Sequence, residues 1–355
     1  MKLNNPQKML GLSFAAAVLV ARTVSAQISI DTRPVSDAGN AAAGTGYGAV
    51  AYNYNIGTTE VTANQYTAFL NAVAQTDTYG LYNVNMGTYL RSQSITRSGL
   101  SGSYTYAVIS GNGNLPVSFV GWGDAARFVN WMHNGQPTGA QNASTTENGA
   151  YTLNGAMGVA TLSITRNAGW TYGLPTENEW VKAAFYTPSG GGSYEANYNT
   201  YATQFGVQPN SRNGSATDPN SANYFYDDSI VNGYNGGLAT VNGPEPTPRV
   251  LLLTDAGAFN TALSYYGTHD QSGNVTEITE ALNGAGTGRI LRGGAPFNTT
   301  SAISITGRGT LPAADEYWDA GFRIVTVVPE PTTMSLMLMA GLSGIYLRQR
   351  RQVAR

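Results

Sequence analysis

The sequence predicts an α+β domain that is rich in loops and poor in regular secondary structure. Three segments have the apolar spacing of helices, and several short runs have the composition of strands. Long stretches of glycine and small polar residues separate them, and 43 of the 355 residues are glycine. A few helices among short strands and long loops indicate α+β architecture rather than a doubly wound parallel sheet.

The N-terminus has the pattern of a signal peptide over residues 1–26. Lys2 and Lys8 form a basic start, an apolar run covers residues 9–20, and small residues at 24–26 form a cleavage site. The apolar run is shorter than a typical membrane span. We therefore expect an exported chain that is cleaved after residue 26. The sequence of residues 27–50 does not decide whether that segment is ordered.

The first helix is expected directly after Thr62. Apolar residues recur at i, i+3, i+4 and i+7 from Tyr66 to Val73, which is one face of a helix. Thr62 and Gln65 have the spacing of a capping box, in which each side chain bonds the backbone N–H of the other residue.

The second helix is expected within residues 120–134. Trp122, Ala125 and Val129 line one face of this segment. Asp124 lies near the N-terminus of the segment, where the helix dipole favours a negative charge.

The third helix is expected in GLPTENEWVKAAFY, residues 173–186. Thr176 and Glu179 form a second capping box, and Glu177 lies in the first turn. Acidic side chains close together also suggest acid–base catalysis, but helix initiation explains these two carboxylates better. We therefore assign no catalytic residue to this segment.

The other elements are short strands and long loops. Strands are expected at 51–57, 104–109, 159–165, 289–293 and 321–327. Long polar loops are expected at 135–155, 186–222 and 232–248.

Charge and cysteine content limit the possible functions. The net charge is −2, and Lys182 is the only lysine between the two terminal signals, so no basic surface for nucleic acid is expected. The chain contains no cysteine. An exported domain without disulfides must be held together by its core or by metal ions.

The last 27 residues have the order of a sorting signal. A Pro-Glu-Pro motif precedes an apolar segment at 334–347, and arginines follow it. A tail-anchor helix is the simpler interpretation. The order resembles a PEP-CTERM signal, and this resemblance implies an exosortase partner and transient anchoring in the inner membrane through a short hydrophobic helix. The chain would then reach the cell envelope, the surface or the extracellular space. The signal residues are Pro329, Glu330, Pro331, Arg348, Arg350 and Arg351.

Six motifs in the central region occur in the order of one known family. They are IGTTEVTANQYTAFLNA (56–72), LPVSFVGWGDAARFVNW (115–131), YGLPTENEW (172–180), YYGTHDQSGNVTE (265–277), RILRGGAPFN (289–298) and AGFRIV (320–325). In this order they resemble the sulfatase-modifying factor, or formylglycine-generating-enzyme-like, family. The resemblance implies one domain over residues 51–328. Its fold would be an irregular, loop-rich α+β variant of the C-type-lectin fold.

The oxidase chemistry of that family is excluded by composition. Formylglycine-generating enzymes hold copper(I) with two cysteine thiolates, and a soft metal ion needs such ligands. The resemblance places these two positions at Asn298 and near Ile303, where this chain has no sulfur. A related branch uses non-haem iron bound by histidines, commonly three. This chain has only His133 and His269, so we expect neither copper nor iron.

Calcium is the cofactor that the sequence favours. In DQSGNVTE, two carboxylates bracket two backbone carbonyls in a loop that contains glycine, and hard oxygen ligands of this kind suit calcium. The spacing matches a structural calcium site of the family. The alternative is a hydrogen-bonded turn in which Asp270 and Asn274 accept bonds from backbone N–H groups. The ligands would be Asp270, Gly273, Val275 and Glu277, with Asn223 and Tyr224 at a second, weaker site.

These observations favour a binding or structural role outside the cell. We expect an envelope- or surface-associated protein with a non-catalytic domain, acting within an extracellular polysaccharide matrix. The chain has 22 tyrosines, which leaves room for an aromatic surface that binds carbohydrate. The alternative is a metal-dependent oxidoreductase on the same fold, with a site that the sequence does not reveal.

Overall fold

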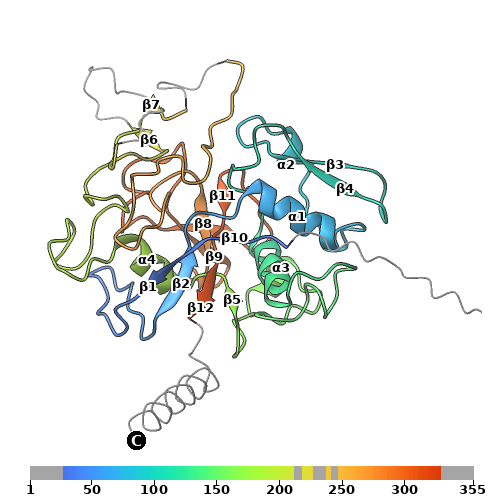
Figure 1. Cartoon of the computed structure of the whole chain (residues 1–355), viewed down its shortest axis with the longest axis horizontal. Helices are drawn as coiled ribbons and strands as arrows, with labels where there is room; N and C mark the ends of the chain where they lie inside the picture. Colours follow the sequence, from blue (N-terminus) through green and yellow to red (C-terminus); the bar gives the residue numbers. More distant parts are fainter. Residues whose placement is uncertain (1–26, 212–217, 227–236, 241–246, 329–355) are drawn as a thin grey trace, which may run out of the picture.

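The computed structural model describes residues 27–211, 218–226, 237–240 and 247–328 (Figure 1). It is a loop-rich α+β domain, which confirms the predicted fold class. The signal peptide, the sorting tail and the expected tail helix lie outside the described residues. Within the described ranges, no helix has the length and apolar character needed to cross a membrane. The helices are α1 (Ala63–Val73), α2 (Asn85–Thr88), α3 (Trp122–His133) and α4 (Glu177–Phe185), with a 3-10 helix at Gly158–Thr161.

One four-stranded antiparallel sheet joins the early and late parts of the domain. Its order is β1-β2-β12-β5, and Val325 of β12 lies opposite Ile56 of β2. Strand β1 pairs with the other edge of β2, so residues before position 51 contribute a strand to the fold. The strands are β1 (Thr32–Val35), β2 (Tyr54–Gly57), β5 (Tyr172–Gly173) and β12 (Val325–Val327).

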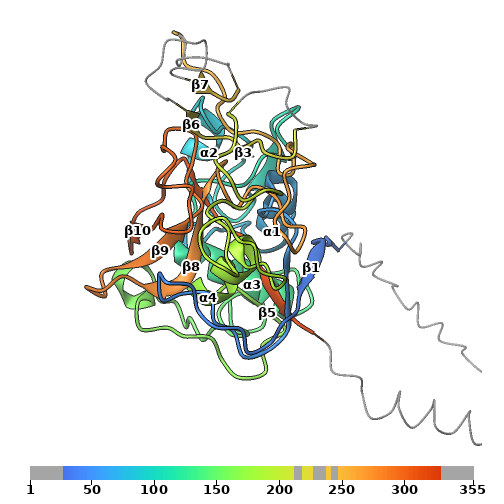
Figure 2. The ribbon, with the colours of Figure 1, turned by 90° about the vertical axis from the view of Figure 1, so that its left-hand side faces the viewer.

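A second four-stranded sheet forms the opposite side of the molecule from α1 (Figure 2). Its order is β10-β9-β8-β11, and only β11 runs parallel to its neighbour. The strands are β8 (Thr276–Leu282), β9 (Gly288–Arg292), β10 (Gly309–Pro312) and β11 (Ala320–Gly321). Two further pairs are β3 (Ile95–Ser98) with β4 (Thr105–Val108) and β6 (Phe225–Tyr226) with β7 (Gly237–Leu238).

All three predicted helices form, and both capping boxes are present. The Gln65 amide N–H donates to the Thr62 hydroxyl at 3.3 Å, and the Thr62 amide donates to the Gln65 side chain at 2.9 Å. At α4, the Glu179 amide donates to Thr176 Oγ1 at 3.1 Å, and the Thr176 amide donates to Glu179 Oε2 at 2.6 Å. These local hydrogen bonds explain why the starts of α1 and α4 could be read from sequence.

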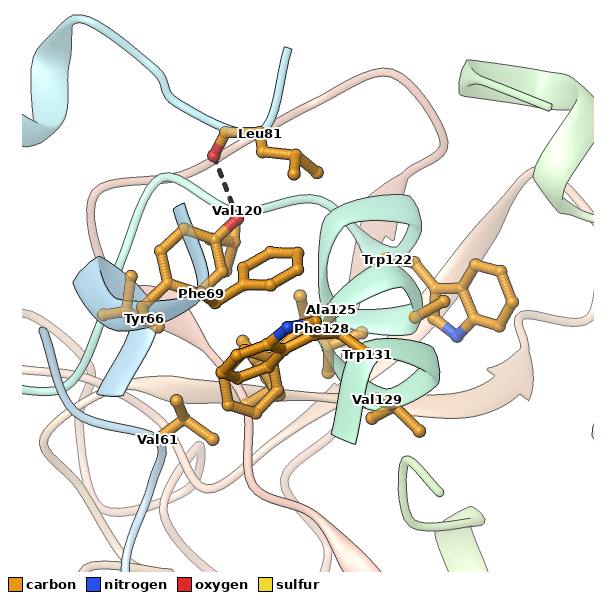
Figure 3. Close-up of a cluster of buried hydrophobic side chains, with 14 of the residues drawn as sticks. Val61, Tyr66, Phe69, Leu81, Val120, Trp122, Ala125, Phe128, Val129 and Trp131 are labelled. Carbon is orange, nitrogen blue, oxygen red and sulfur yellow. Dashed lines mark hydrogen bonds between the residues drawn. The ribbon is translucent and has the colours of Figure 1, made fainter. Parts of the chain in front are cut away.

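Helices α1 and α3 bury an aromatic core between them (Figure 3). The Tyr66 ring lies 5.4 Å from Phe69 and 6.0 Å from Phe128, and Trp131 lies 5.4 Å from Phe69. The Tyr66 hydroxyl donates to the Leu81 carbonyl at 2.9 Å, which satisfies its buried polar end. The apolar face predicted from helical periodicity is therefore the face that is buried.

The expected strand at 159–165 is wrong. Its first residues form the 3-10 helix instead, and Gly158 has a positive φ of 51°. Arg289 Nη2 donates to the Thr161 carbonyl at 2.6 Å and to the Ile164 carbonyl at 3.0 Å, in place of the backbone N–H groups of a neighbouring strand. The expected strand at 321–327 exists, but it is divided between the two sheets as β11 and β12.

Buried arginine–carboxylate pairs connect distant segments of this cysteine-free domain. Such pairs add little net stability compared with apolar packing, but breaking one of them is costly. Their main effect is therefore on which segments of the chain contact one another, and their effect on the free energy of unfolding is small. The pairs are Arg127 with Glu147, Arg166 with Glu179 and Glu280, Arg292 and Arg308 with Glu177, and Arg323 with Glu277.

Candidate functional site

A cavity of about 500 Å³ lies beside the second sheet, between β9, β10 and the loop that follows β9. Its lining is polar and apolar in about equal parts, with one arginine and one carboxylate at accessible positions. The polar side chains that line it are Thr276, Arg292, Asn298, Ser301, Thr306, Arg308, Thr310, Tyr317 and Asp319.

Two glycines turn the chain from β9 into the loop that forms the cavity wall. Gly293 and Gly294 have φ values of +96° and +73°, a region that side chains disfavour. A Cβ on Gly294 would lie 2.6 Å from the side chain of Ile303. The loop is then fixed by Asn298, whose Oδ1 accepts the Ala295 amide at 2.9 Å and whose carbonyl accepts the Phe225 amide at 2.9 Å.

Glu177 holds the arginine at the floor of the cavity. Arg308 donates from Nε to Glu177 Oε1 at 2.8 Å and from Nη2 to Oε2 at 3.1 Å. Arg292 donates to the same carboxylate through Nε at 2.9 Å. The single Glu177 carboxylate balances the charge of only one of the two guanidinium groups. The arginine pair therefore leaves a net positive charge beside the cavity, where 32% of the Arg308 side chain is exposed.

One aromatic side chain, Tyr317, lines the cavity, and Phe297 precedes the lining residue Asn298 in the chain. Tyr317 and Phe297 are 37% and 39% exposed. Phe297 packs edge-on against Trp318 at 5.8 Å, and the Arg91 guanidinium lies 4.7 Å from the centre of the Phe297 ring. These contacts hold the Phe297 ring in place before any ligand arrives.

Asp319 is the carboxylate of the cavity. Burial raises the pKa of its carboxyl group, while the positive charge of Arg91 acts in the opposite direction. The cavity therefore offers hydroxyl, amide, guanidinium and carboxyl groups next to an aromatic edge. Such a set can bind a polar ligand that has several hydrogen-bonding groups and one apolar face.

The two positions that the family resemblance assigned to copper ligands have different surroundings. Asn298 lines the cavity, whereas Ile303 is buried in a small cluster with Ala222 and Tyr224. The histidines also differ in surroundings: His133 pairs its ring Nδ1 with the Thr171 hydroxyl at 2.8 Å, and the His269 ring is part-buried with a pKa lowered by desolvation. Among the described residues, no three His, Cys, Asp or Glu side chains are grouped as metal ligands would be.

In the predicted calcium loop, the Glu277 carboxylate forms a buried ion pair with an arginine. The Arg323 guanidinium donates to both Glu277 oxygens, at 2.5 Å and 2.6 Å, and Trp180 Nε1 donates at 2.8 Å. Both Glu277 and Arg323 are fully buried. A calcium ion at this loop would share the Glu277 carboxylate with Arg323, and the role of Glu277 as a ligand stays a prediction.

The hydrogen bonds of the alternative turn are present in the same loop. Asp270 Oδ2 accepts the Gly257 amide at 2.5 Å, and Asn274 Oδ1 accepts the Thr254 amide at 3.0 Å. Asp270 and Asn274 both have positive φ, of 62° and 66°, which these residue types tolerate better than most. Calcium binding by Asp270 with the Gly273 and Val275 carbonyls stays a prediction.

The weaker second site also has competing contacts. The Tyr224 carbonyl accepts the Ser211 hydroxyl at 2.5 Å. The Asn223 side chain donates from Nδ2 to the Leu252 carbonyl at 2.9 Å, whereas its Oδ1 is buried with no hydrogen-bond partner among the described residues. The Asn223 Oδ1 and the second lone pair of the Tyr224 carbonyl are both left for a cation, and this second site stays a prediction.

Sequence reasoning singled out Asn298 but not the other side chains that shape the cavity. Arg308 and Tyr317 lie in none of the six motifs, and they converge only when β9, β10 and the 313–319 loop are assembled. The one local signal is the Gly293-Gly294 pair, which marks a tight turn after a predicted strand.

The sequence matches the domain family described as sulfatase-modifying factor enzyme 1-like over residues 36–328. The chain belongs to this family. The fold is accordingly formylglycine-generating-enzyme-like and loop-rich α+β, as the six motifs predicted. No curated protein matches the sequence.

Solved structures with a similar arrangement include three of low sequence identity to this sulfatase-modifying factor-like chain. Treponema denticola variable protein 1 has a TM-score of 0.48 at 16% identity, covering 84% of this chain and 95% of its own. The crystal structure of CarF has a TM-score of 0.46 at 20% identity, covering 85% and 99%. PvdO from Pseudomonas aeruginosa has a TM-score of 0.40 at 15% identity, covering 84% and 92%.

Proposed function

We propose that this chain is an exported, non-catalytic member of the family that binds a glycan in the cavity beside Asn298. The observation that carries the proposal is the lining of that cavity. It combines hydroxyl and amide groups with an apolar surface of about equal extent, and the ring of Tyr317 lies on it. Sugars present the same combination, because their hydroxyl groups need several partners while one face of the ring is apolar.

The absence of cysteine supports a binding role over the chemistry of formylglycine-generating enzymes. Thiolate-bound copper(I) requires two sulfur ligands, and the chain contains none. The acidic residues of the PTENEW motif are also committed elsewhere: Glu177 binds two arginines, and Glu179 caps α4 and pairs with Arg166. The competing proposal of a metal-dependent oxidoreductase predicts one equivalent of copper or iron per purified chain, which elemental analysis measures.

The glycan proposal is tested by binding of the purified mature protein to an array of bacterial and matrix polysaccharides. Tyr317→Ala removes the exposed ring at the rim, and we expect about tenfold weaker binding, equivalent to about 1.4 kcal/mol. Tyr265→Ala is the matched control, because Tyr265 is also an exposed tyrosine, at 55%, and does not line the cavity. Equal effects of the two substitutions, or no polysaccharide binding at all, would refute the proposal.

We also propose that residues 329–355 act as a PEP-CTERM-type sorting signal, recognised by an exosortase at the inner membrane. The support is the order of the Pro-Glu-Pro motif, the apolar segment and the terminal arginines. Removing the tail should release the domain into the medium in folded form. Replacing Arg348, Arg350 and Arg351 by glutamine should block processing and leave the full-length chain in the membrane fraction. Unchanged surface retention after removal of the tail would contradict this role.

A further inference from the structure

Two arginines lie opposite each other beside the cavity and share one carboxylate. In the antiparallel pair of β9 and β10, Gly309 lies opposite Leu291, and one position further along this register Arg308 lies opposite the last residue of β9, which is also an arginine. Like charges directly opposite each other on neighbouring strands are unfavourable. Glu177 reduces this cost, because it accepts hydrogen bonds from Arg292 Nε at 2.9 Å and from Arg308 Nε at 2.8 Å. One carboxylate balances one guanidinium, so one positive charge remains.

Among the described residues, no second carboxylate pairs with these two arginines. Glu277 lies opposite Arg292 in β8, but both of its oxygens accept hydrogen bonds from Arg323, at 2.5 Å and 2.6 Å. Asp319 lines the cavity, where burial raises the pKa of its carboxyl group, and the cation that lowers this pKa is Arg91. The uncompensated positive charge therefore stays with the arginine pair.

The shape of the guanidinium group directs the free donors of Arg308 away from Glu177. Arg308 uses Nε and Nη2 for the two Glu177 oxygens, at 2.8 Å and 3.1 Å. A guanidinium has five N–H donors in one plane, so the edge formed by Nη1 and the second Nη2 hydrogen is left over. No described residue accepts a hydrogen bond from Arg308 Nη1, whereas Nη1 of Arg292 donates to two backbone carbonyls, at 3.0 Å and 2.7 Å. The free edge belongs to a side chain that lines the cavity and is 32% exposed, so a ligand can reach it.

Neighbouring groups hold the arginine pair in place and add a further donor. The centre of the Tyr47 ring lies 5.1 Å from the guanidinium carbon of Arg292 and 5.3 Å from that of Arg308, which are cation–π contacts. Asn298 also lines the cavity, and its Oδ1 is occupied by the Ala295 amide at 2.9 Å. The Asn298 Nδ2 group donates to no residue in the described part of the chain. The cavity thus presents guanidinium and amide N–H donors together, a set that suits the oxygens of an anion.

We propose that the cavity selects acidic sugars, and that the free edge of Arg308 binds their anionic group, a carboxylate or a sulfate. This inference rests on the proposed glycan-binding function. A planar pair of N–H donors matches two oxygens of either group, and the uncompensated positive charge strengthens both hydrogen bonds. A neutral sugar gains neither effect. An acidic polysaccharide therefore binds more tightly than a neutral one with the same sugar rings, and salt reduces the difference.

The test is binding of the purified mature protein to pairs of polysaccharides that differ only in charge. Alginate and polygalacturonate are each compared with their carboxyl-reduced forms, and dextran sulfate is compared with dextran. At least one acidic probe should bind about tenfold more tightly than its neutral counterpart, which is the effect expected from a hydrogen bond to a charged group. The carboxylate and sulfate pairs show which anionic group is preferred. The preference should decrease as the salt concentration rises.

Arg308→Gln tests the residue. It removes the charge and leaves Glu177 paired with Arg292, so the domain should still fold. This variant should lose the preference for the acidic probe and bind the neutral counterpart as the wild type does. Arg97→Gln is the matched control, because Arg97 is also a paired arginine, with 29% of its side chain exposed, and does not line the cavity. It should keep the preference.

The outcomes separate this inference from the function on which it rests. Equal binding of every acidic probe and its neutral counterpart would overturn the inference and leave glycan binding in place. The same holds if Arg308→Gln keeps the preference, or if Arg97→Gln loses it to the same extent. No binding to any of the polysaccharides would refute both.

Discussion

Replacing Arg323 by methionine is expected to be among the most destabilising single changes in this domain. The substitution leaves Glu277 buried without its cation, and losing one partner of a buried pair costs about 3–5 kcal/mol. It also removes the donors to the Gly57 and His269 carbonyls, each at 2.9 Å. With about 1 kcal/mol for each carbonyl left without a donor, we expect a total near 5 to 7 kcal/mol.

The measurement is urea unfolding of the mature protein, completed as a double-mutant cycle with Glu277→Gln. The double variant has no buried unpaired charge, so it should be more stable than the sum of the single effects predicts, by about 3 kcal/mol. Arg97→Met is the control, because 29% of the Arg97 side chain is exposed and the buried Asp77 carboxylate keeps the Leu81 and Tyr82 amides as donors, at 2.7 Å and 3.2 Å. It should cost no more than about 2 kcal/mol. Additive single effects, or a cost for Arg323→Met no larger than the control, would refute this account.

Three further outcomes are expected from the structure. Glu179→Gln should cost about 2 kcal/mol in urea unfolding, more than a capping residue alone, because Glu179 also accepts hydrogen bonds from Arg166 at 2.9 Å and 3.1 Å. Gly294→Ala should abolish ligand binding in the cavity and destabilise the fold by at least about 1 kcal/mol, since a Cβ would meet an isoleucine at 2.6 Å in a left-handed conformation. Burial and the charge of Glu316 raise the pKa of Asp124 in the folded state. The folded state therefore keeps this proton to higher pH than the unfolded state, and the associated stability is lost as pH rises above the usual carboxyl range. Asp124→Asn should reduce that loss, seen as a smaller difference between urea midpoints at pH 5 and pH 8.

The sequence by itself determined the local elements and the family. The starts of α1 and α4 depend on hydrogen bonds between residues three positions apart, so the capping boxes at Thr62 and Thr176 could be read directly. The buried faces of these helices follow from apolar spacing. The missing cysteines excluded thiolate-bound copper without any coordinates, because composition alone decides whether such a ligand exists.

Only the tertiary structure decided which charges meet and where the cavity lies. Glu277 pairs with Arg323 across 46 residues, and no pattern in the sequence indicates this ion pair. The buried carboxylate of Glu60 drew no attention in the sequence, because its hydrogen-bond donor, Asn274, is more than two hundred positions away. At 159–165, where a strand was expected, Arg289 from another segment donates hydrogen bonds to the Thr161 and Ile164 carbonyls. Local patterns encode hydrogen bonds within a few residues, whereas the neutralisation of buried charge depends on contacts that form only when the whole chain is folded.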